Sequence, residues 1–490
     1  MSTRIATVRR LLRVATFWAA ALVAACGGGD ASTRLVTVQH SPGDFPSGSS
    51  HVEYLFLGEV GEWVALAAEY GLNGGNLVEV PTDTTGLLVR AHSEEHEMLA
   101  EQLYLVSPAG EAATATSFSR WMTQDQRIQA SALYQITIPG AHDAGMGKID
   151  KCSFYANAKT TQTQDSSIAG MLHNGIRYFD LRPMYAGLDL RVQDREMRLG
   201  HYSWVGNTID IGIYKFTLRN EGCTGYTVAA ALDDVRDFMA GSDNREVVIL
   251  KMSHFQNLRT HDNSSSHFDP ADIAELERMV KEKLGAYLLI GNPDFRTAPI
   301  SQLTASGPKV IVTFDVGGHD GSSGIYSQSD LHLYDEYANK ASYDAMKKDQ
   351  FGKMAVSAQR MDPIPVQEWI DLYLCNTMVG PISEQCYKRA EAAYANQWRL
   401  YPYFVLSWTL TQSEHQMIGC TVGTTEPIRL ALALAGYACT TLPELGKKAN
   451  GHLPDVLAEA KAKRRYPNVL YVDQASAQAT ATAIAINRLH

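Results

Sequence analysis

From Trp121 to the C-terminus, short apolar segments of strand length alternate with longer segments that have apolar residues at three- and four-residue spacing. This alternation predicts a parallel sheet, because parallel neighbouring strands must be joined by a crossover that is usually a helix. Eight strand candidates fit a closed barrel, so the predicted fold class is α/β, a distorted TIM-like (βα)8 barrel over residues 121–490. The candidate strands are 134–138, 176–182, 197–202, 247–252, 310–316, 354–358, 403–408 and 469–472. The candidate helices are 228–239, 271–284, 367–374, 383–398, 427–435 and 453–465.

Residues 34–118 follow a different pattern, in which short alternating apolar segments are separated by turns rich in Gly, Pro and Asp. Alternation with a period of two is typical of strands that are buried on one face only. We therefore predict a small, mainly-β N-terminal domain before the barrel.

The first 25 residues have the features of a targeting signal. Four arginines precede an apolar run, residues 14–25, that is too short to span a bilayer. The run ends in Ala24-Ala25-Cys26, which resembles the lipobox of bacterial lipoproteins, where cleavage leaves a lipidated cysteine as the new N-terminus. Residues 26–33 would form a flexible tether. We predict an exported lipoprotein of the bacterial cell envelope, anchored to the membrane through Cys26; a plain cleaved signal with an incidental cysteine is the alternative.

The other six cysteines are an even number, which suits disulfides in an oxidising compartment. They are Cys152, Cys223, Cys375, Cys386, Cys420 and Cys439. Cys375 with Cys386 and Cys420 with Cys439 are attractive local pairs, but the sequence leaves the connectivity open.

The charge of the chain argues against a polyanionic partner. The formal net charge is −10, and residues 1–25 contain four arginines and no acids, so the chain from Cys26 onward carries −14. Phosphate backbones and anionic lipid surfaces repel such a chain. We expect no nucleic-acid partner, and attachment to a membrane should depend on the lipid anchor.

The segment 136–145 is an apolar strand that breaks at Pro139-Gly140 and then presents His142 and Asp143 between small residues. A histidine just past the end of a buried parallel strand is placed to act as an acid or a base. A structural histidine at a turn would produce the same local pattern.

This segment resembles the first signature of the phosphatidylinositol-specific phospholipase C family, an apolar strand followed by Pro-Gly, a small residue, His, Asp or Asn, a small residue and Gly. Further segments continue the resemblance in the same order: 173–182 is similar to the second strand, 200–202 to the second histidine, 246–255 to the fourth strand and 467–473 to the closing strand with its terminal aspartate. Together they cover about residues 134–474. The N-terminal β region lies outside the resemblance.

The resemblance implies the roles of five residues. His142 would take the proton from an inositol hydroxyl, and His201 would protonate the departing diacylglycerol oxygen. Arg182 would bind phosphoryl oxygens, although a structural ion pair with Asp180 is the alternative. Asp473 would orient His142 and Asp143 would assist His201. Because an arginine stands where metal-requiring relatives carry a carboxylate, the resemblance implies no metal and no cofactor.

Three further residues lie in or next to predicted strands. Lys251, within an otherwise apolar strand, would contact the substrate or pair with an internal carboxylate. The resemblance makes Asp315 a candidate substrate-binding residue, because it stands where bacterial family members use an arginine to bind inositol, and in this it departs from the family pattern. Arg177 lies on the opposite face from Arg182 by strand alternation and is predicted to be a surface or inter-element charge.

The predicted function is a phosphodiesterase that cleaves a phosphatidylinositol or glycosyl-phosphatidylinositol headgroup through a cyclic inositol phosphate and releases diacylglycerol. Two alternatives remain: the same machinery acting on another lipid or glycerophosphodiester, and a non-catalytic surface binding protein on this scaffold. A monomer is expected. Tyr401, Tyr403 and Trp408 would form either an aromatic rim near lipid or part of the core.

Overall fold

In a computed structural model of the 490-residue chain, the described residues lie between 33 and 106 and between 114 and 489. The longer gaps are 187–195, 259–266, 358–402 and 423–437, and shorter gaps occur elsewhere. The signal, Cys26, Cys375, Cys386, Tyr401 and the helices predicted at 367–374, 383–398 and 427–435 lie outside the described residues. The chain divides into two compact units, Met1–Ala115 and Thr116–His490.

The first unit contains a sheet of seven strands in the order β3-β2-β5-β6-β7-β1-β4. Val36 and Val38 are buried whereas Leu35, which precedes Val36, is 56% exposed, so side chains alternate between a core face and an outer face. The predicted mainly-β character of this region is confirmed. Its strands are β1 (Thr33–His40), β2 (His51–Leu57), β3 (Trp63–Gly71), β4 (Gly74–Pro81), β5 (Gly86–His92), β6 (Met98–Val106) and β7 (Thr114–Ser117).

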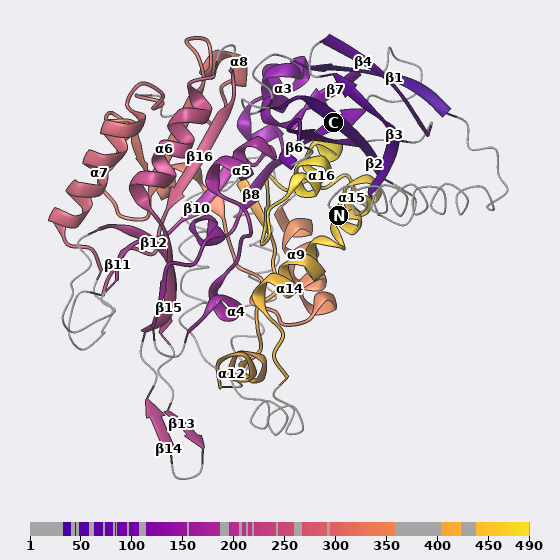
Figure 1. The fold of residues 1–490 in the computed structure, drawn as a ribbon. Coiled ribbons are helices and arrows are strands. Elements are labelled where there is room, and N and C mark those ends of the chain that lie inside the picture. Colours follow the sequence, from indigo (N-terminus) through magenta and orange to yellow (C-terminus); the bar gives the residue numbers. More distant parts are fainter. Residues whose placement is uncertain are drawn as a thin grey trace, which may run out of the picture. The chain divides into compact units, whose positions relative to one another are not determined.

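The second unit contains a sheet of eight strands, all paired in parallel, in the order β19-β18-β16-β10-β8-β22-β21-β20 (Figure 1). The central strands are buried along their whole length, which explains their continuous apolar sequences. In chain order the strands are β8 (Ile138–Ala141), β10 (Tyr178–Leu181), β16 (Val247–Met252), β18 (Lys309–Phe314), β19 (Ile325–Ser327), β20 (Leu333–Tyr334), β21 (Tyr403–Trp408) and β22 (Val469–Val472).

The two edge strands of this sheet, β19 and β20, are joined by only five residues, 328–332. That connection spans at most roughly 20 Å, so the sheet must curl until its edges approach each other. Among the described residues, β19 and β20 do not pair with each other. The α/β class and the number of parallel strands agree with the prediction, although β19 and β20 were not among the predicted strands. The barrel is open at this point, which we call the seam.

Two of the predicted barrel strands were wrong, and one was displaced. Residues 197–202 do form a strand, β12 (Arg198–Trp204), but it belongs to a separate sheet with antiparallel pairs. Residues 354–357 end the helix α9 (Tyr343–Ser357), because a short apolar run cannot by itself distinguish strand from helix. The first strand begins only at Ile138, after the 3-10 helix η3 (Leu133–Gln135).

The separate sheet has the order β17-β11-β12-β15-β9 and lies beyond the end of β10. A disulfide between Cys152 and Cys223 joins its strands β9 and β15, and a second disulfide joins Cys420 to Cys439, one of the two local pairs that the sequence suggested. A further hairpin consists of β13 and β14. The bounds are β9 (Lys151–Cys152), β11 (Pro183–Tyr185), β13 (Thr208–Ile211), β14 (Tyr214–Thr217), β15 (Asn220–Thr227) and β17 (Gln256–Asn257).

Helices cover the outside of the parallel sheet, with α6 and α7 next to β16 (Figure 1). The helices predicted at 228–239, 271–284 and 453–465 are confirmed as α6, α7 and α15. The helices are α2 (Trp121–Gln124), α3 (Gln126–Ala130), α4 (Ala158–Thr161), α5 (Ile168–His173), α6 (Val228–Met239), α7 (Pro270–Leu284), α8 (Ile300–Leu303), α9, α12 (Glu414–Val422), α14 (Leu442–Asn450), α15 (Leu453–Lys463) and α16 (Ala477–Asn487). The other 3-10 helices are η2 (Phe118–Arg120), η4 (Ala144–Gly147) and η5 (Gln328–Leu331).

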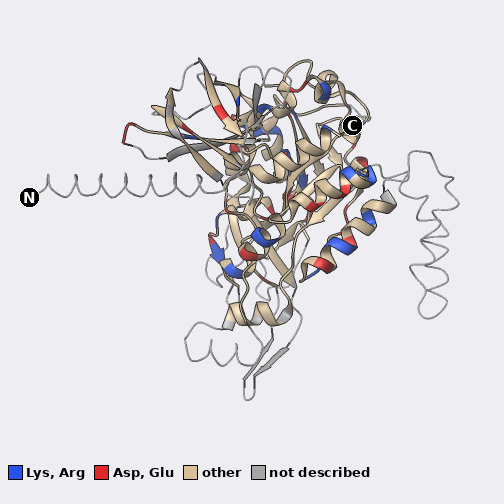
Figure 2. Ribbon diagram, turned by 90° about the vertical axis from the view of Figure 1, so that its right-hand side faces the viewer, with Lys and Arg blue, Asp and Glu red and all other residues tan. Residues whose placement is uncertain are grey.

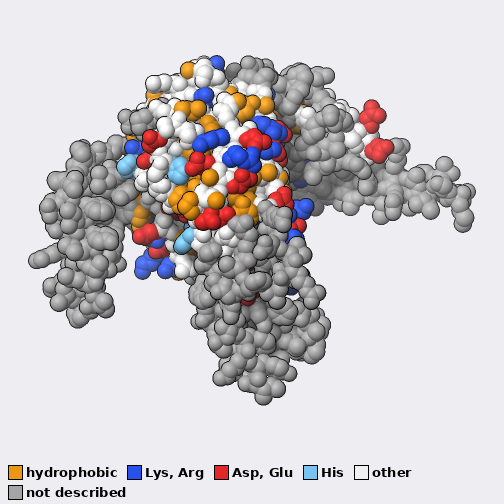
Figure 3. Space-filling model, turned by 90° about the vertical axis from the view of Figure 1, so that its left-hand side faces the viewer, with side chains coloured by type: hydrophobic (Ala, Val, Ile, Leu, Met, Phe, Trp, Pro, Cys, Tyr) orange, Lys and Arg blue, Asp and Glu red, His pale blue; other side chains and the backbone are white. Residues whose placement is uncertain are grey.

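Acidic and basic side chains alternate along helices on one side of the molecule (Figure 2), and they are mixed on the described surface seen from the other side (Figure 3). On α7, Arg278 forms ion pairs with Glu275 and Glu282, and Lys281 pairs with Glu277. The charge on this helix is therefore locally balanced. Among the described residues, no helix combines the length and the apolar character needed to cross a bilayer.

Arg177 lies on the outer face of β10's sheet, opposite Arg182, but it is completely buried rather than at the surface. Its Nε donates to Glu246 at 2.8 Å, and its other nitrogens donate to backbone carbonyls that include those of Leu172 and Ser119. Glu246 also accepts from the backbone and hydroxyl of Thr123. The prediction of an inter-element charge is confirmed, and this buried pair joins β10 and β16 to the segments around them.

Candidate active site

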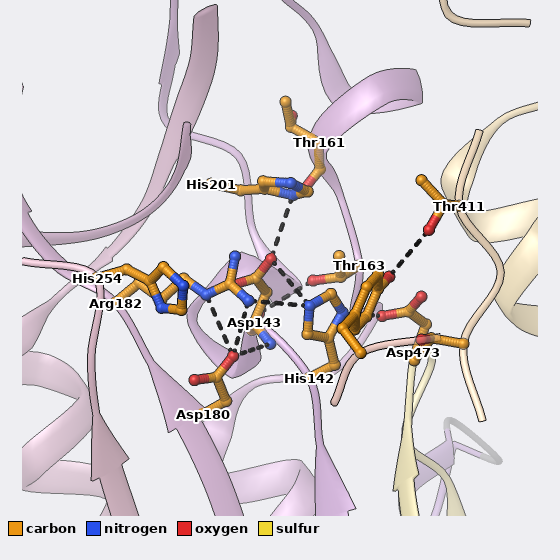
Figure 4. Close-up of polar contacts among 12 residues, drawn as sticks. His142, Asp143, Thr161, Thr163, Asp180, Arg182, His201, His254, Thr411 and Asp473 are labelled. Atoms are coloured by element: carbon orange, nitrogen blue, oxygen red, sulfur yellow. Dashed lines mark hydrogen bonds and ion pairs between the residues drawn. The ribbon is translucent and has the colours of Figure 1, made fainter. Parts of the chain in front are cut away.

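The C-terminal ends of three adjacent strands carry His142, Arg182 and Asp473. His142 directly follows β8, Arg182 follows β10, and Asp473 follows β22. Since β8 lies between β10 and β22 in the sheet, these side chains converge at one end of it (Figure 4). This is the end of a parallel sheet at which active sites gather.

Gly140 allows β8 to pack closely against its neighbouring strands just before His142. A Cβ on Gly140 would lie 2.8 Å from the side chain of Val469, so only glycine fits between the neighbouring strands. The N–H of His142 still donates to Val472 at 3.0 Å, which fixes the backbone at the end of the strand. Asp143 then adopts a left-handed conformation with φ 42°, a strained geometry for a residue with a side chain.

His142 is held by Asp473 on one side and by Arg182 on the other. Its Nδ1 lies 2.7 Å from Asp473 Oδ1, and Arg182 Nη2 lies 3.0 Å from its Nε2. A guanidinium can only donate, so Nε2 accepts and the proton of the neutral ring resides on Nδ1. The imidazole therefore directs a lone pair into the site, as a general base requires.

Arg182 forms ion pairs with both Asp143 and Asp180. Tyr471 donates its hydroxyl to Asp180 at 2.6 Å and Ser253 donates to it at 3.1 Å, so this carboxylate is fully engaged. The structural ion pair between Arg182 and Asp180 is thus present, and it holds the guanidinium at the centre of the site rather than away from it.

His201 enters the site from β12, in the other sheet. Its Nδ1 lies 3.1 Å from the carbonyl oxygen of Thr161 and 3.4 Å from Asp143 Oδ2. The ring centroids of His201 and His142 are 6.5 Å apart. The two imidazoles therefore flank Arg182, with Asp143 contacting all three side chains.

The electrostatic surroundings shift the pKa values of the two histidines in opposite directions. Burial lowers the pKa of His142, but the charges of Asp143 and Asp473 outweigh burial and raise it overall. Burial also lowers the pKa of His201, and there the net pKa stays below its usual value, with Arg182 and His142 contributing in the same direction. In the free site, a shared proton is therefore favoured on His142.

A cavity of about 610 Å³ opens onto these residues. Its lining includes His142, Arg182, His201, Lys251, Asp335, Tyr337, Tyr471 and Asp473. The dimensions lie in the range of small-molecule binding sites. The lining side chains named here are polar or charged, which suits a ligand with several hydrogen-bonding groups.

Several of these lining or supporting residues were missed by the sequence reasoning. Tyr471 precedes Asp473 by two positions, so strand alternation places both side chains on the same face and could have revealed it, whereas Asp180 was already named as a partner of Arg182. Asp335 and Tyr337 follow the two-residue strand β20, and no periodic pattern marks them.

Lys251 pairs with an internal carboxylate, which is one of its two predicted alternatives, and it also lines the cavity. It forms an ion pair with Asp335, and its Nζ lies 3.9 Å from Asp180. Asp315 lies elsewhere: it accepts from the N–H of His254 at 2.7 Å and lines a second, adjoining cavity. Tyr403 and Trp408 are buried in the core.

His142, Asp143 and Asp180 place potential metal-binding atoms within 4.8 Å of one another. The guanidinium of Arg182 lies where a metal cation would neutralise these carboxylates, because it already forms ion pairs with Asp143 and Asp180. The side chains present therefore fit a built-in organic cation better than a metal ion.

Residues 161–164, which we call the brace, connect the candidate catalytic residues through hydrogen bonds to their backbone. Gln164 Nε2 donates to the carbonyl oxygen of His142 at 2.6 Å, and its Oε1 accepts from Ala475 at 2.7 Å. The Thr163 hydroxyl donates to the carbonyl oxygen of Asp143 at 3.0 Å. The carbonyl oxygen of Thr161 also contacts Nδ1 of His201. The brace therefore contacts both histidines and determines the spacing between them.

Replacing Gln164 with methionine should remove these bonds while preserving the side-chain volume. If the brace positions His142, kcat for any reaction in which this histidine transfers a proton falls by about 10- to 100-fold, with little change in KM. Asn468→Leu is the matched control, because this buried amide bridges Tyr134 and Phe404 at the opposite end of β22. Equal losses of kcat in both variants at equal thermal stability would contradict a positioning role.

Comparisons with known proteins find similarity at the level of structure. No family profile matches the sequence, and no curated protein matches it significantly. The structure is similar to the phosphatidylinositol-specific phospholipase C of Listeria monocytogenes, with 12% identity and a TM-score of 0.43 over 76% of this chain and 99% of that one. It is also similar to the enzyme of Staphylococcus aureus, with 14% identity and a TM-score of 0.38 over 74% of this chain and 97% of that one. A calcium-dependent phospholipase of a Pseudomonas species has 13% identity and a TM-score of 0.23 over 39% of this chain and 60% of that one.

Proposed function

We propose that this chain is a phosphodiesterase of the phosphatidylinositol-specific phospholipase C type, exported and held at the bacterial cell envelope by lipid on Cys26. The observation that carries the proposal is the placement of two histidines on either side of Arg182, each with a carboxylate beside it. This arrangement supplies a base, an acid and a cation for the phosphoryl oxygens around one cavity.

In the first step, Nε2 of His142 takes the proton of a ring hydroxyl next to the phosphate. That oxygen forms a bond to phosphorus, the bond between phosphorus and the diacylglycerol oxygen breaks, and His201 gives the leaving oxygen a proton. Arg182 turns its Nη2 from His142 to a phosphoryl oxygen, where it stabilises the charge that grows in the transition state. Water then opens the cyclic phosphate with the two histidines in exchanged roles.

The reaction requires one proton on the histidine pair, because His142 must be neutral and His201 charged. The free site favours the opposite distribution, so only a fraction of the singly protonated enzyme is in the reactive form. A bound phosphate anion, close to both rings, raises the pKa of each and supports protonation of His201. The pair is expected to titrate as a unit with two apparent pKa values.

Phosphorus NMR of the purified protein with phosphatidylinositol micelles in excess EDTA tests the proposal. We expect a cyclic phosphate signal that survives chelation, because Arg182 supplies the cation, and that is lost in His142→Ala. A signal that appears only after calcium is added would contradict the metal-independent mechanism. No turnover with or without calcium would overturn the phosphatidylinositol assignment.

The lipid anchor is tested separately by mass spectrometry of the envelope fraction. Cys26→Ser should abolish the mass of the attached lipid and release the protein from membranes. Retention of the membrane-bound form in this variant would contradict anchoring through Cys26.

A further inference from the structure

Part of the wall of the active-site cavity consists of side chains from three helices. Thr160 comes from α4, Met417 from α12 and Leu442 from α14. The short helix α4 lies beside the other two (Figure 1). Its last residue, Thr161, belongs to the brace and places its carbonyl oxygen 3.1 Å from Nδ1 of His201 (Figure 4). The position of α4 therefore decides where this histidine finds its partner.

A disulfide between Cys420 and Cys439 holds α12 against the irregular segment that precedes α14. The side-chain amide of Asn157 donates to the carbonyl oxygen of Cys420 at 3.3 Å. The same side chain caps α4, because its Oδ1 accepts from the backbone N–H of Lys159 at 2.9 Å. Asn157 thus joins the part of α12 that carries the disulfide to the first turn of α4.

Gln412 forms a second connection between the disulfide and α4. Its Nε2 donates to the carbonyl oxygen of Thr440, the neighbour of Cys439, at 2.6 Å. The same nitrogen donates to the carbonyl oxygen of Lys159 at 3.2 Å and lies 3.5 Å from Sγ of Cys420. Since Gln412 also lines the cavity, a change at the disulfide reaches both α4 and the cavity wall.

The two described disulfides differ in their surroundings. The other one joins β9 to β15 beside backbone hydrogen bonds such as that from the N–H of Ser153 to Gly222 at 2.9 Å. These bonds would keep the two strands in register without the covalent link. Cys420 and Cys439 instead join a helix to an irregular segment, and Cys439 is partly exposed. This link is therefore accessible to a reductant, and its opening frees the end of α12.

We propose that the Cys420–Cys439 disulfide is a redox switch for the active site: the closed bond holds α4 and His201 in the reactive arrangement, and reduction lowers activity. This inference rests on the proposed function, because it concerns regulation of the same site. A dithiol, such as that of a thiol–disulfide exchange protein, supplies two electrons and two protons and becomes a disulfide, while the two cysteines become thiols. Release of α12 loosens both connections to α4, so the carbonyl oxygen of Thr161 withdraws from His201.

The first test measures kcat of the full chain on phosphatidylinositol before and after treatment with dithiothreitol, with the opened bond identified by alkylation. We expect kcat to fall by about tenfold or more and to recover on reoxidation, because small displacements of catalytic groups have large effects. The double variant Cys420→Ser with Cys439→Ser should have the low kcat of the reduced wild type and no response to dithiothreitol. An unchanged kcat after reduction, a bond that resists reduction in the folded protein, or a double variant that still responds would overturn the inference.

The titration of His201 separates this inference from the proposed function, because it needs no turnover. Burial lowers the pKa of His201, and Arg182 and His142 act in the same direction. Asp143 and the carbonyl oxygen of Thr161 raise this pKa. Loss of the Thr161 contact on reduction should therefore lower the pKa of His201 further, as measured by NMR of its imidazole, with His201→Gln for assignment. An unchanged pKa would contradict a route through α4.

Asn157→Ser tests the connection while the disulfide is intact. A serine can still cap α4 but is too short to donate to Cys420, so kcat should fall in the same direction as on reduction, by a smaller factor. Thr421→Val is the matched control, because the hydroxyl of Thr421 donates to Met417 within α12. It should keep the kcat and the redox response of the wild type. Equal losses of kcat in the two variants would contradict the assigned connection.

Discussion

Asp473→Asn should lower kcat by about 10³- to 10⁴-fold, although the side chain keeps its shape. Asp473 accepts from Nδ1 of His142 at 2.7 Å and thereby leaves the lone pair on Nε2. An asparagine can present its amide N–H to Nδ1 instead, which moves the ring proton to Nε2 and removes the base. The variant would also lose the negative charge of Asp473, which stabilises the imidazolium that forms during the reaction.

The same variant should also shift the pH dependence of catalysis, and the direction of this shift is a second test. The negative charge of Asp473 raises the pKa of His142, so its removal should lower that pKa. Because His142 contributes mainly the upper apparent pKa of the pair, the alkaline limb of the kcat/KM profile should move to lower pH and the bell should narrow. An alkaline limb that stays in place while kcat falls would show that Asp473 does not act through His142.

Glu246→Ala should destabilise the second unit by about 3–5 kcal/mol, the range observed when one partner of a buried ion pair is removed. Arg177 and Glu246 are both fully buried, so the variant would leave the guanidinium uncompensated. The backbone N–H of Thr123 would also lose its acceptor. The measurement is the free energy of unfolding from denaturant titration.

Glu275→Ala is the matched control for this prediction. Glu275 also pairs with an arginine, Arg278, but both side chains are exposed on α7. Its removal should cost no more than about 1 kcal/mol, because solvent screens an exposed pair. Similar losses in the free energy of unfolding of the two variants would contradict the prediction that a buried ion pair contributes more to stability than an exposed one.

Strand alternation and strand ends explain why much of the site could be predicted from the sequence. His142, Arg182 and Asp473 each follow a strand of a parallel sheet, and such ends meet on one side wherever the strands are adjacent. The same alternation correctly separated Arg177 from Arg182. It did not reveal that Arg177 is buried, because burial depends on η2 and α5, which pack over that face.

His201 shows the limit of local patterns. Its segment was recognised as a strand, but an apolar run of strand length does not specify its partners. It pairs with β11 and β15, and the contact with Asp143 arises only because this second sheet stands beside the end of the first. The disulfide from Cys152 to Cys223, which are 71 residues apart, depends on the same long-range pairing.

The sequence by itself determined the α/β class, the N-terminal β region, the central strands and the residues at their ends, because these follow from periodicity and from the chemistry of short segments. Only the tertiary structure decided the open seam, the second cavity and the places of Asp335, Tyr337 and Gln164 around the histidines. These residues lie in short or irregular segments without a repeating pattern. Their positions follow from contacts between distant parts of the chain, and such contacts leave no local periodicity in the sequence.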